Sequence, residues 1–419
     1  MRRMWIWVFV AVAALLVISC AAPGTPTAPE TPTTPETPTT PETPTTPETG
    51  HPYAGLFTKP DGTPYKFIQI CDTTECICMV EQLQPLTGWI EAGGGEIDIL
   101  SCEFDASRQM GMYEDAITRR PDAIVSKPIN APTLVTYIEQ AKAAGIPFIN
   151  SLLPIFGPDK KPHPDILTYV GDFNDDRGLV TGMYLAWWAE QNQTEVTVLE
   201  QWGIYAFEEW SVPVDRGFRE GLGDSEWVTV IESDEAQFNN DLAYTVTLDA
   251  MTAHPEINAI YVTTCMQLNG TVSALQALDR WEVIGDPNHM MVLTGDAEPW
   301  MIDLGLDGYI DFDMDYGCYQ YSDLVCKSLY WAIVRGQSIP KHVFTVSKAV
   351  VQEPTGIYGE RGEWTYQEIH DLMEDIGTDY ANWEPFQGYH WADQLALPNA
   401  DTPSWDTGVP ERPSWTYQD

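Results

Sequence analysis

Acidic side chains alternate with large apolar ones in residues 310–316, Ile-Asp-Phe-Asp-Met-Asp-Tyr. If this segment is a β-strand, its period of two places Asp311, Asp313 and Asp315 on one face. Aligned like charges are costly unless donors or a cation compensate them. The segment does not fit a calcium-binding EF-hand loop, because its sixth position is Tyr316 rather than glycine. We expect Asp313 and Asp315 to accept hydrogen bonds from ligand hydroxyls and Asp311 to be solvated; a positively charged ligand is the alternative.

Further polar and aromatic side chains follow several predicted strands. A site for a small cyclic ligand presents planar hydrogen-bonding groups at the ring edge and aromatic faces above and below the ring. Residues 202–210 contain four aromatic side chains and follow a predicted strand, so we expect them to line a binding site rather than to form a surface loop with core aromatics. The expected ligand-binding residues are Asp72, Phe104, Asn150, Asn174, Trp202, Trp210, Arg216, Asp296, Asp313 and Asp315.

No pattern in the sequence predicts catalysis, a metal or a cofactor. The chain has no Gly-x-Ser-x-Gly elbow, His-Glu-x-x-His helix or phosphate-binding loop. Cys76 and Cys78 have the wrong spacing for a zinc site, and no second Cys or His pair accompanies them. A secreted glycoside hydrolase with paired carboxylates is an alternative, but Glu208 and Glu209 are only neighbours in sequence. We therefore expect a binding protein and not an enzyme.

The composition excludes several classes of partner. The 419 residues include 62 acidic and 21 basic ones, for a formal net charge of −41. Nucleic acids and anionic lipid surfaces both require clustered Lys and Arg, so neither is an expected partner. A hydrophobic content of 44% is enough for a substantial core, and the length indicates two or three domains. Small ligands remain, polyhydroxylated or cationic ones included.

The N-terminus predicts export. Residues 1–20 carry two arginines and then an apolar run too short for a comfortable membrane span, which is typical of a secretory signal. The run ends in Val17-Ile18-Ser19-Cys20, which resembles the bacterial lipobox and implies a lipid on Cys20 that anchors the protein in the cell membrane. An uncleaved signal anchor is the alternative. Either way, the rest of the chain is expected to face the periplasm or the exterior.

Residues 21–55 form a Pro/Thr-rich linker in which Pro-Thr-Thr-Pro-Glu-Thr recurs. Regular proline favours polyproline II and forbids helix or sheet, so this segment is expected to be a semi-rigid spacer.

Seven cysteines follow Cys20, an odd number that leaves at least one thiol without an intramolecular partner. Cys71 and Cys102 fall at the ends of predicted strands, where a bridge would be allowed, but the sequence does not decide the pairing.

Short strands alternate with helices from residue 65 onward, which predicts βαβ units and parallel sheets. The alternation of strands and helices is interrupted near residue 171 and then resumes. We therefore expect two Rossmann-like lobes with ligands beyond the carboxyl ends of the strands. The expected strands are 66–70, 96–100, 122–126, 146–149 and 166–170, then 195–199, 228–231, 257–262 and 290–293. The expected helices are 80–92, 106–119, 132–144, 178–191, 218–222, 242–253, 268–278 and 366–376.

Several segments of residues 65–340 resemble the periplasmic sugar-binding proteins of the ribose- and galactose-binding type, the solute receptors of ABC importers. The most specific segment is Ala141-Lys-Ala-Ala-Gly-Ile-Pro147, which is similar to the family's A-x-x-x-G-I-P turn. The order and spacing of the segments carry the resemblance more than any one of them. The others are Pro121-Asp-Ala-Ile-Val125, Tyr169-Val-Gly171 with Asn174 and Gly178, His254-Pro255-x-Ile257, Gly308-Tyr-Ile310 and Gly336-x-x-Ile339-Pro340.

The resemblance implies the type I periplasmic binding protein fold, with two α/β lobes joined by a three-strand hinge. It implies an N-terminal lobe of residues 60–173 plus 297–315 and a C-terminal lobe of residues 174–296 plus 316–345. Residues 346–419 are longer than the family needs and are expected to pack on the lobes as a C-terminal extension.

The implied function is capture of a sugar or similar small polyol in the interlobe cleft by a monomer, for an ABC permease. A receptor for a membrane sensor shares the fold and is the alternative.

The resemblance also has departures. Asp296 is similar to an aspartate of the family's pocket. Thr264 and Cys265 stand where the family usually has an Asn-Asp pair, and Val214 where it has a pocket arginine. Asp315 stands at the position of a common glutamine. The resemblance therefore implies the architecture more firmly than the identity of the ligand.

Overall fold

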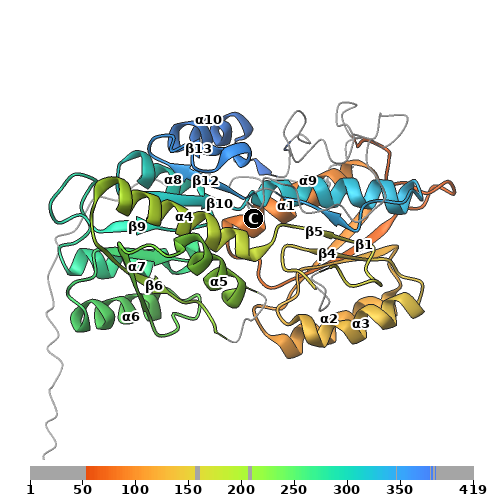
Figure 1. Cartoon of the computed structure of the whole chain (residues 1–419). Coiled ribbons are helices and arrows are strands. Elements are labelled where there is room, and N and C mark those ends of the chain that lie inside the picture. The colour runs from red at the N-terminus through yellow and green to blue at the C-terminus, as the bar shows by residue number, and fades with distance from the viewer. Residues whose placement is uncertain are drawn as a thin grey trace, which may run out of the picture. The chain divides into compact units, whose positions relative to one another are not determined.

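The computed structural model describes residues 53–155, 161–205, 210–345, 347–377, 379–380 and 383 (Figure 1). All of them belong to one compact unit. The predicted signal peptide, Cys20, the linker up to residue 52, and Phe207, Glu208 and Glu209 lie outside the described residues, as does most of the C-terminal extension beyond residue 377.

The first lobe is built on a six-stranded parallel sheet in the order β11-β5-β4-β3-β1-β2. Side chains cap two of its helices, because Asp105 accepts from Arg108 N at the start of α2 and Asn130 accepts from Thr133 N at the start of α3. Its strands are β1 (Lys66–Cys71), β2 (Glu96–Ser101), β3 (Ala123–Ser126), β4 (Phe148–Ser151), β5 (Thr168–Val170) and β11 (His342–Val343), and its helices are α1 (Ile77–Ala92), α2 (Ala106–Arg119), α3 (Ala131–Ala143) and α9 (Cys318–Leu329).

The second lobe is built on a seven-stranded sheet in the order β13-β12-β10-β9-β8-β6-β7, parallel except for the β10–β12 pair. Its strands are β6 (Val196–Gln201), β7 (Val228–Glu232), β8 (Ala259–Val262), β9 (Met291–Leu293), β10 (Phe312–Asp315), β12 (Lys348–Val351) and β13 (Glu363–Thr365). Its helices are α4 (Asn174–Asn192), α5 (Ser211–Leu222), α6 (Asn240–Ala253), α7 (Cys265–Ala277), α8 (Pro299–Leu306) and α10 (Tyr366–Ile376).

The chain passes between the two sheets three times. The first crossing, residues 171–173, leads from β5 to α4, and the second, residues 316–317, leads from β10 to α9. The third crossing, described at residues 344, 345 and 347, leads from β11 to β12. Figure 1 shows the two sheets side by side with their helices around them. The predicted fold class, two parallel-sheet α/β lobes with three connections, is confirmed.

The predicted division of the later residues between the lobes is wrong. β10 pairs with β9 and β12, so residues 297–315 belong to the second lobe and not to the first. α9 packs on α1, and β11 pairs with β5, so residues 318–343 belong to the first lobe. The described part of the extension supplies β12, β13 and α10 to the second lobe and reaches α1 of the first, where Trp89 Nε1 donates to the Trp383 carbonyl.

The contact between α4 and α5 requires glycine. A Cβ atom on Gly178 would lie 1.8 Å from the Val214 carbonyl oxygen, and one on Gly217 would lie 1.8 Å from the Asp175 carbonyl oxygen. The two backbones therefore approach each other more closely than any side chain allows. This contact fixes the first turn of α4, which carries several residues of the hinge.

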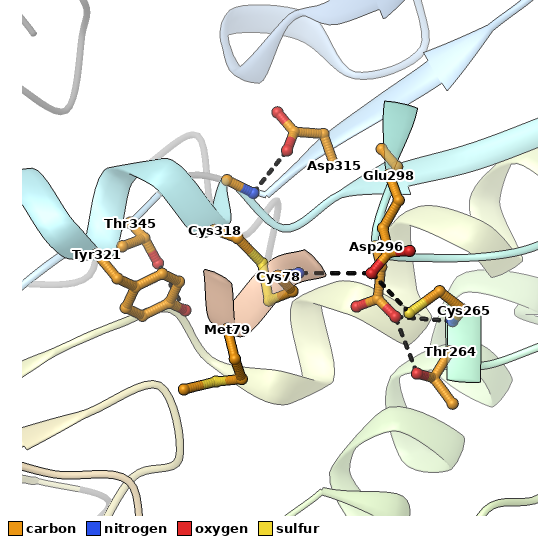
Figure 2. Close-up of a disulfide and its surroundings, with 12 residues drawn as sticks. Cys78, Met79, Thr264, Cys265, Asp296, Glu298, Asp315, Cys318, Tyr321 and Thr345 are labelled. Atoms are coloured by element: carbon orange, nitrogen blue, oxygen red, sulfur yellow. Dashed lines mark hydrogen bonds between the residues drawn. A yellow bond between two sulfur atoms is a disulfide. The ribbon is translucent and has the colours of Figure 1, made fainter. Parts of the chain in front are cut away.

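One disulfide joins Cys78 at the start of α1 to Cys318 at the start of α9 (Figure 2). It ties the second crossing to the first lobe. Cys71 and Cys102, between which the sequence allowed a bridge, are both buried free thiols. No helix within the described ranges is long and apolar enough to span a bilayer.

Candidate ligand-binding cleft

A cleft with about 510 Å³ of empty space, part of it open to solvent, lies between the lobes where the strands of both sheets end. Loops after β1, β2, β3 and β4 form one wall, and the second lobe forms the other. The lining residues are Asp72, Cys76, Cys78, Phe104, Lys127, Leu152, Leu153, Arg177, Trp210, Phe238, Thr264, Cys265, Met266, Asp296 and Tyr316.

A buried ion pair lies in the first wall. Lys127 Nζ is 2.8 Å from Asp72 Oδ2, and both side chains are less than a tenth exposed. Asp72 follows β1 and also accepts from Thr73 N at 2.8 Å, while Gln109 Nε2 donates to the Lys127 carbonyl at 2.9 Å. Burial lowers the pKa of Lys127, but Asp72 and the nearby Cys76 raise it by more, so the pKa lies above its usual value. Both side chains therefore have polar partners within this wall.

Asp296 is the principal acceptor of the second wall (Figure 2). Its Oδ2 accepts from Thr264 Oγ1 at 2.8 Å and from Cys265 N at 2.7 Å. Its φ of +99° lies in the left-handed region, where a residue other than glycine is strained. Burial, followed by the nearby Glu298 carboxylate, raises the pKa of Asp296 to about 6. The loop after β9 therefore holds a half-buried carboxylate in the cleft at a cost in backbone energy.

Glu298 joins the two lobes beside Asp296. Its Oε1 accepts from Cys78 N of the first lobe at 3.4 Å and from Cys265 Sγ of the second lobe at 3.1 Å (Figure 2). Its Oε2 accepts from Trp300 Nε1 at 2.7 Å. The disulfide and this glutamate thus lie together at the edge of the cleft.

Two phenylalanines meet across the cleft. The ring centroids of Phe104, from the loop after β2, and Phe238, from the loop before α6, are 5.8 Å apart. Both residues have left-handed backbone, with φ of +56° and +53°. The two lobes are therefore in side-chain contact around a lining that is largely apolar.

Four of the ten predicted ligand-binding residues line the cleft: Asp72, Phe104, Trp210 and Asp296. Asn150 is buried behind it and shapes the loop that carries Leu152 and Leu153, because it donates to the Leu153 carbonyl at 2.8 Å and accepts from Ile155 N at 2.9 Å. Asn150 therefore supports the lining loop from behind without lining the cleft itself.

Five predicted residues lie elsewhere. Asn174 is buried in the first turn of α4, and Trp202 packs edge-on against Tyr205 with ring centroids 4.9 Å apart. Arg216 is half exposed and pairs with Asp175 at 2.8 Å. The remaining two, Asp313 and Asp315, are on β10 and are described next.

Asp313 and Asp315 are fully buried and accept hydrogen bonds from the chain around β10. Asp313 accepts from Met314 N at 2.7 Å and Ala297 N at 3.3 Å, and Asp315 accepts from Gly317 N at 2.6 Å and Tyr319 Oη at 2.8 Å. Burial raises the pKa of both carboxyls above the usual range. Asp311, which we expected to be solvated, is also buried and pairs with His289 at 3.0 Å. The three aspartates therefore hold β10 and the backbone next to it, and Asp315 also holds the second crossing, through Gly317 N.

Sequence reasoning missed the two cations of the cleft and part of its aromatic lining. Lys127 follows β3 in the same way that Asp72 follows β1, so its position after a strand was an available signal. Arg177 lies inside the first turn of α4, where nothing distinguishes it from a solvated helix residue. Phe238 and Tyr316 stand in loops whose path the strand rhythm does not define.

Residues 89–338 match the family model described as a periplasmic binding protein domain. The match spans more than half of the chain, and the chain belongs to this family. A comparison with curated proteins finds no match.

Solved structures share the fold. The arabinose-binding protein of Shewanella sp. ANA-3, bound to α- and β-L-arabinofuranose, has a TM-score of 0.62 at 15% identity over 74% of this chain and 97% of its own. A solute-binding protein of Actinobacillus succinogenes with bound D-allose has a TM-score of 0.59 at 18% identity over 68% and 97%. One from Bacillus halodurans with bound myo-inositol has a TM-score of 0.60 at 17% identity over 70% and 96%. The family and these proteins are solute-binding proteins and not enzymes.

The cleft chemistry is consistent with reversible binding. It offers carboxylate acceptors, cationic donors and aromatic faces. Within the described ranges, no group of three or more His, Cys, Asp or Glu side chains could hold a metal ion. The arrangement can orient hydroxyl groups and enclose a small apolar face.

Proposed function

We propose that this protein captures a sugar or similar small polyol in the interlobe cleft and delivers it unaltered to an ABC importer. The observation that carries the proposal is the cleft itself, in which carboxylates and aromatic rings from two lobes joined by three crossings surround one small space. The sugars and the polyol bound by the similar structures from Shewanella, Actinobacillus and Bacillus support this choice of ligand class.

The proposal includes a lipid anchor. Cys20 in the lipobox-like segment would carry the lipid, and residues 21–55 would hold the body away from the membrane as a spacer. The family supports an extracytoplasmic place for the domain. Incorporation of labelled palmitate into the full chain, and its loss in Cys20→Ala, tests the anchor independently of ligand binding.

Isothermal titration of the purified protein with pentoses, hexoses, inositols, nucleosides and polyamines tests the binding proposal. A hit should also raise the unfolding temperature, because a ligand that binds only the folded state stabilises it by mass action. Chromatography of the recovered ligand should return it chemically unchanged. Steady conversion of any glycoside, or binding of polyamines alone, would contradict the proposal.

A further inference from the structure

A single guanidinium group contacts the hinge from inside the cleft. Arg177 in α4 is fully buried and lines the cleft. Its Nε and Nη2 atoms donate to the two carboxylate oxygens of Asp172, both at 3.1 Å. Asp172 belongs to the first crossing, so this two-pronged ion pair binds the first crossing to the second lobe.

The same group stacks on the second crossing. The guanidinium carbon of Arg177 lies 4.1 Å from the ring centroid of Tyr316 and 4.5 Å from that of Trp210. The two rings meet edge to face with centroids 5.6 Å apart. A cation over desolvated aromatic faces is attracted by both of them, so Arg177 holds residue 316 as well as residue 172.

The third crossing is connected to Arg177 through Asp172. Ser347 Oγ donates to Asp172 Oδ2, and Tyr321 Oη lies 3.4 Å from Asp172 Oδ1 and from Arg177 Nη2. Thr345 Oγ1 donates to Tyr321 Oη at 3.1 Å, and Figure 2 shows these two side chains next to each other. All three crossings are thus within one or two hydrogen bonds or ring contacts of Arg177.

Two donors of this group have no partner within the described part of the chain. They are Arg177 Nη1 and Trp210 Nε1, each buried and each on a side chain that lines the cleft. An unpaired buried N–H is costly, and an acceptor oxygen of a molecule bound in the cleft would remove that cost for the atom that it reaches. Asp172 neutralises the guanidinium, so the acceptor need not be charged.

We propose that Arg177 couples occupation of the cleft to the hinge. Resting on the proposed function above, it is a positioning residue: an acceptor oxygen of the bound sugar or polyol completes its hydrogen bonds, and the completed group holds the three crossings in one arrangement. A ring or hydroxyl oxygen of a neutral sugar or polyol and a carboxylate of a sugar acid share this acceptor chemistry.

Hydrogen–deuterium exchange of the full protein tests the coupling. Arg177→Lys keeps the positive charge but removes the two-pronged hydrogen bonding to Asp172 and the planar stacking on Tyr316 and Trp210. Arg335→Lys is the matched control, because Arg335 is exposed and its guanidinium lies 5.5 Å from the ring of Trp331 and 5.9 Å from that of Tyr330, away from the cleft. Without ligand, exchange in all three crossings should rise together in R177K and stay at the wild-type level in R335K. Unchanged exchange in the crossings, or a rise confined to α4, would overturn the proposal.

Titration with L-arabinose, D-allose, myo-inositol and D-galacturonate, one at a time, tests the role of the ligand. The wild type should bind at least one compound and gain protection in all three crossings, and R177K should bind it about tenfold more weakly without that gain. A preference for D-galacturonate would identify a carboxylate as the acceptor; a preference for the neutral compounds would identify a ring or hydroxyl oxygen. If R177K saturated with ligand showed full protection of the three crossings, Arg177 would be only a ligand contact, and the coupling would be refuted.

Ser347→Ala provides a second variant if R177K unfolds. It removes one bond to Asp172 and is not itself a lining residue, so only a hinge coupled through Arg177 predicts faster exchange at the second crossing, residues 316–317, as well as at the first and third. If the wild type binds none of the four compounds, the proposed function loses its support, while the ligand-free exchange data still decide the coupling.

Discussion

Phe104 of the first lobe and Phe238 of the second lie with their ring centroids 5.8 Å apart, each on left-handed backbone. The pair connects the lobes at a point that shares no backbone with the three crossings. Separation of the lobes must therefore break this aromatic contact, and the first prediction concerns its energy.

Phe104→Ala and Phe238→Ala should each speed release of a bound sugar, because aromatic pairs contribute about 0.5–1.5 kcal/mol beyond their buried area. A double-mutant cycle on the dissociation rate, measured by stopped-flow displacement, should give a coupling of that size. Tyr309→Ala serves as the control, since that ring stacks on Trp281 at 5.1 Å without lining the cleft. Strictly additive effects would show that the pair does not resist opening.

Affinity for a hydroxylated ligand should fall as the pH drops through about 6, where Asp296 takes up a proton and loses acceptor capacity. Titration calorimetry should show about tenfold weaker binding at pH 5 than at pH 7. Asp296→Asn should bind weakly with little dependence on pH. An equal slope in both proteins would place the titrating group elsewhere.

Protonation of Asp296 should have opposite effects on binding and on folding: it weakens ligand binding but stabilises the folded protein. Its pKa is higher in the folded protein than in the unfolded chain, so its stabilising contribution is present at low pH and is lost as the pH rises through about 6. The difference in unfolding temperature between the wild type and Asp296→Asn should therefore shift in favour of the variant from pH 5 to pH 8. A shift in favour of the wild type would contradict the burial that raises the pKa.

Lys127→Met should lower the free energy of unfolding by about 3–5 kcal/mol, because it leaves the Asp72 carboxylate buried without its partner. The double variant Lys127→Met, Asp72→Leu should regain most of that loss, since it removes both charges. Urea unfolding of the three proteins measures the effect. A double variant no more stable than the single one would show that the ion pair itself supplies net stability.

Reduction of the Cys78–Cys318 disulfide should lower the unfolding free energy by roughly 3–5 kcal/mol, because the bridge closes a loop of 240 residues. Calorimetry with and without dithiothreitol should show the difference in the wild type. The variant Cys78→Ser, Cys318→Ser should unfold at the lower temperature under both conditions. An effect of reductant on that variant would point to a different bridge.

The sequence predicted the elements well where local chemistry decides them. The helix expected at 366–376 is α10 to the residue, and Thr365 and Glu368 form a capping box at its start. The observed strands that begin at residues 66, 96, 123, 148, 196, 228 and 259 also begin within two residues of the expected positions. Short apolar runs between helix-forming segments are sufficient to place them.

The assignment of residues to lobes failed because it depends on pairing, which period and propensity do not encode. The run from Ile310 to Asp315 is a good strand in either sheet, and only its pairs with β9 and β12 decide which sheet it joins. The site shows the same limit. Asp72 and Asp296 follow strands and were found, whereas Arg177 acts through Asp172 and Tyr316, two residues that only the assembled hinge brings to it.

β12 lies antiparallel to β10 and β13 extends the sheet beyond it, although the family match ends at residue 338. A protein shortened to the family's span would expose the unpaired backbone edge of Phe312–Asp315, which could template pairing with a neighbouring molecule. Residues 348–365 therefore cover this strand edge and oppose aggregation, and recombinant production of the domain should retain them.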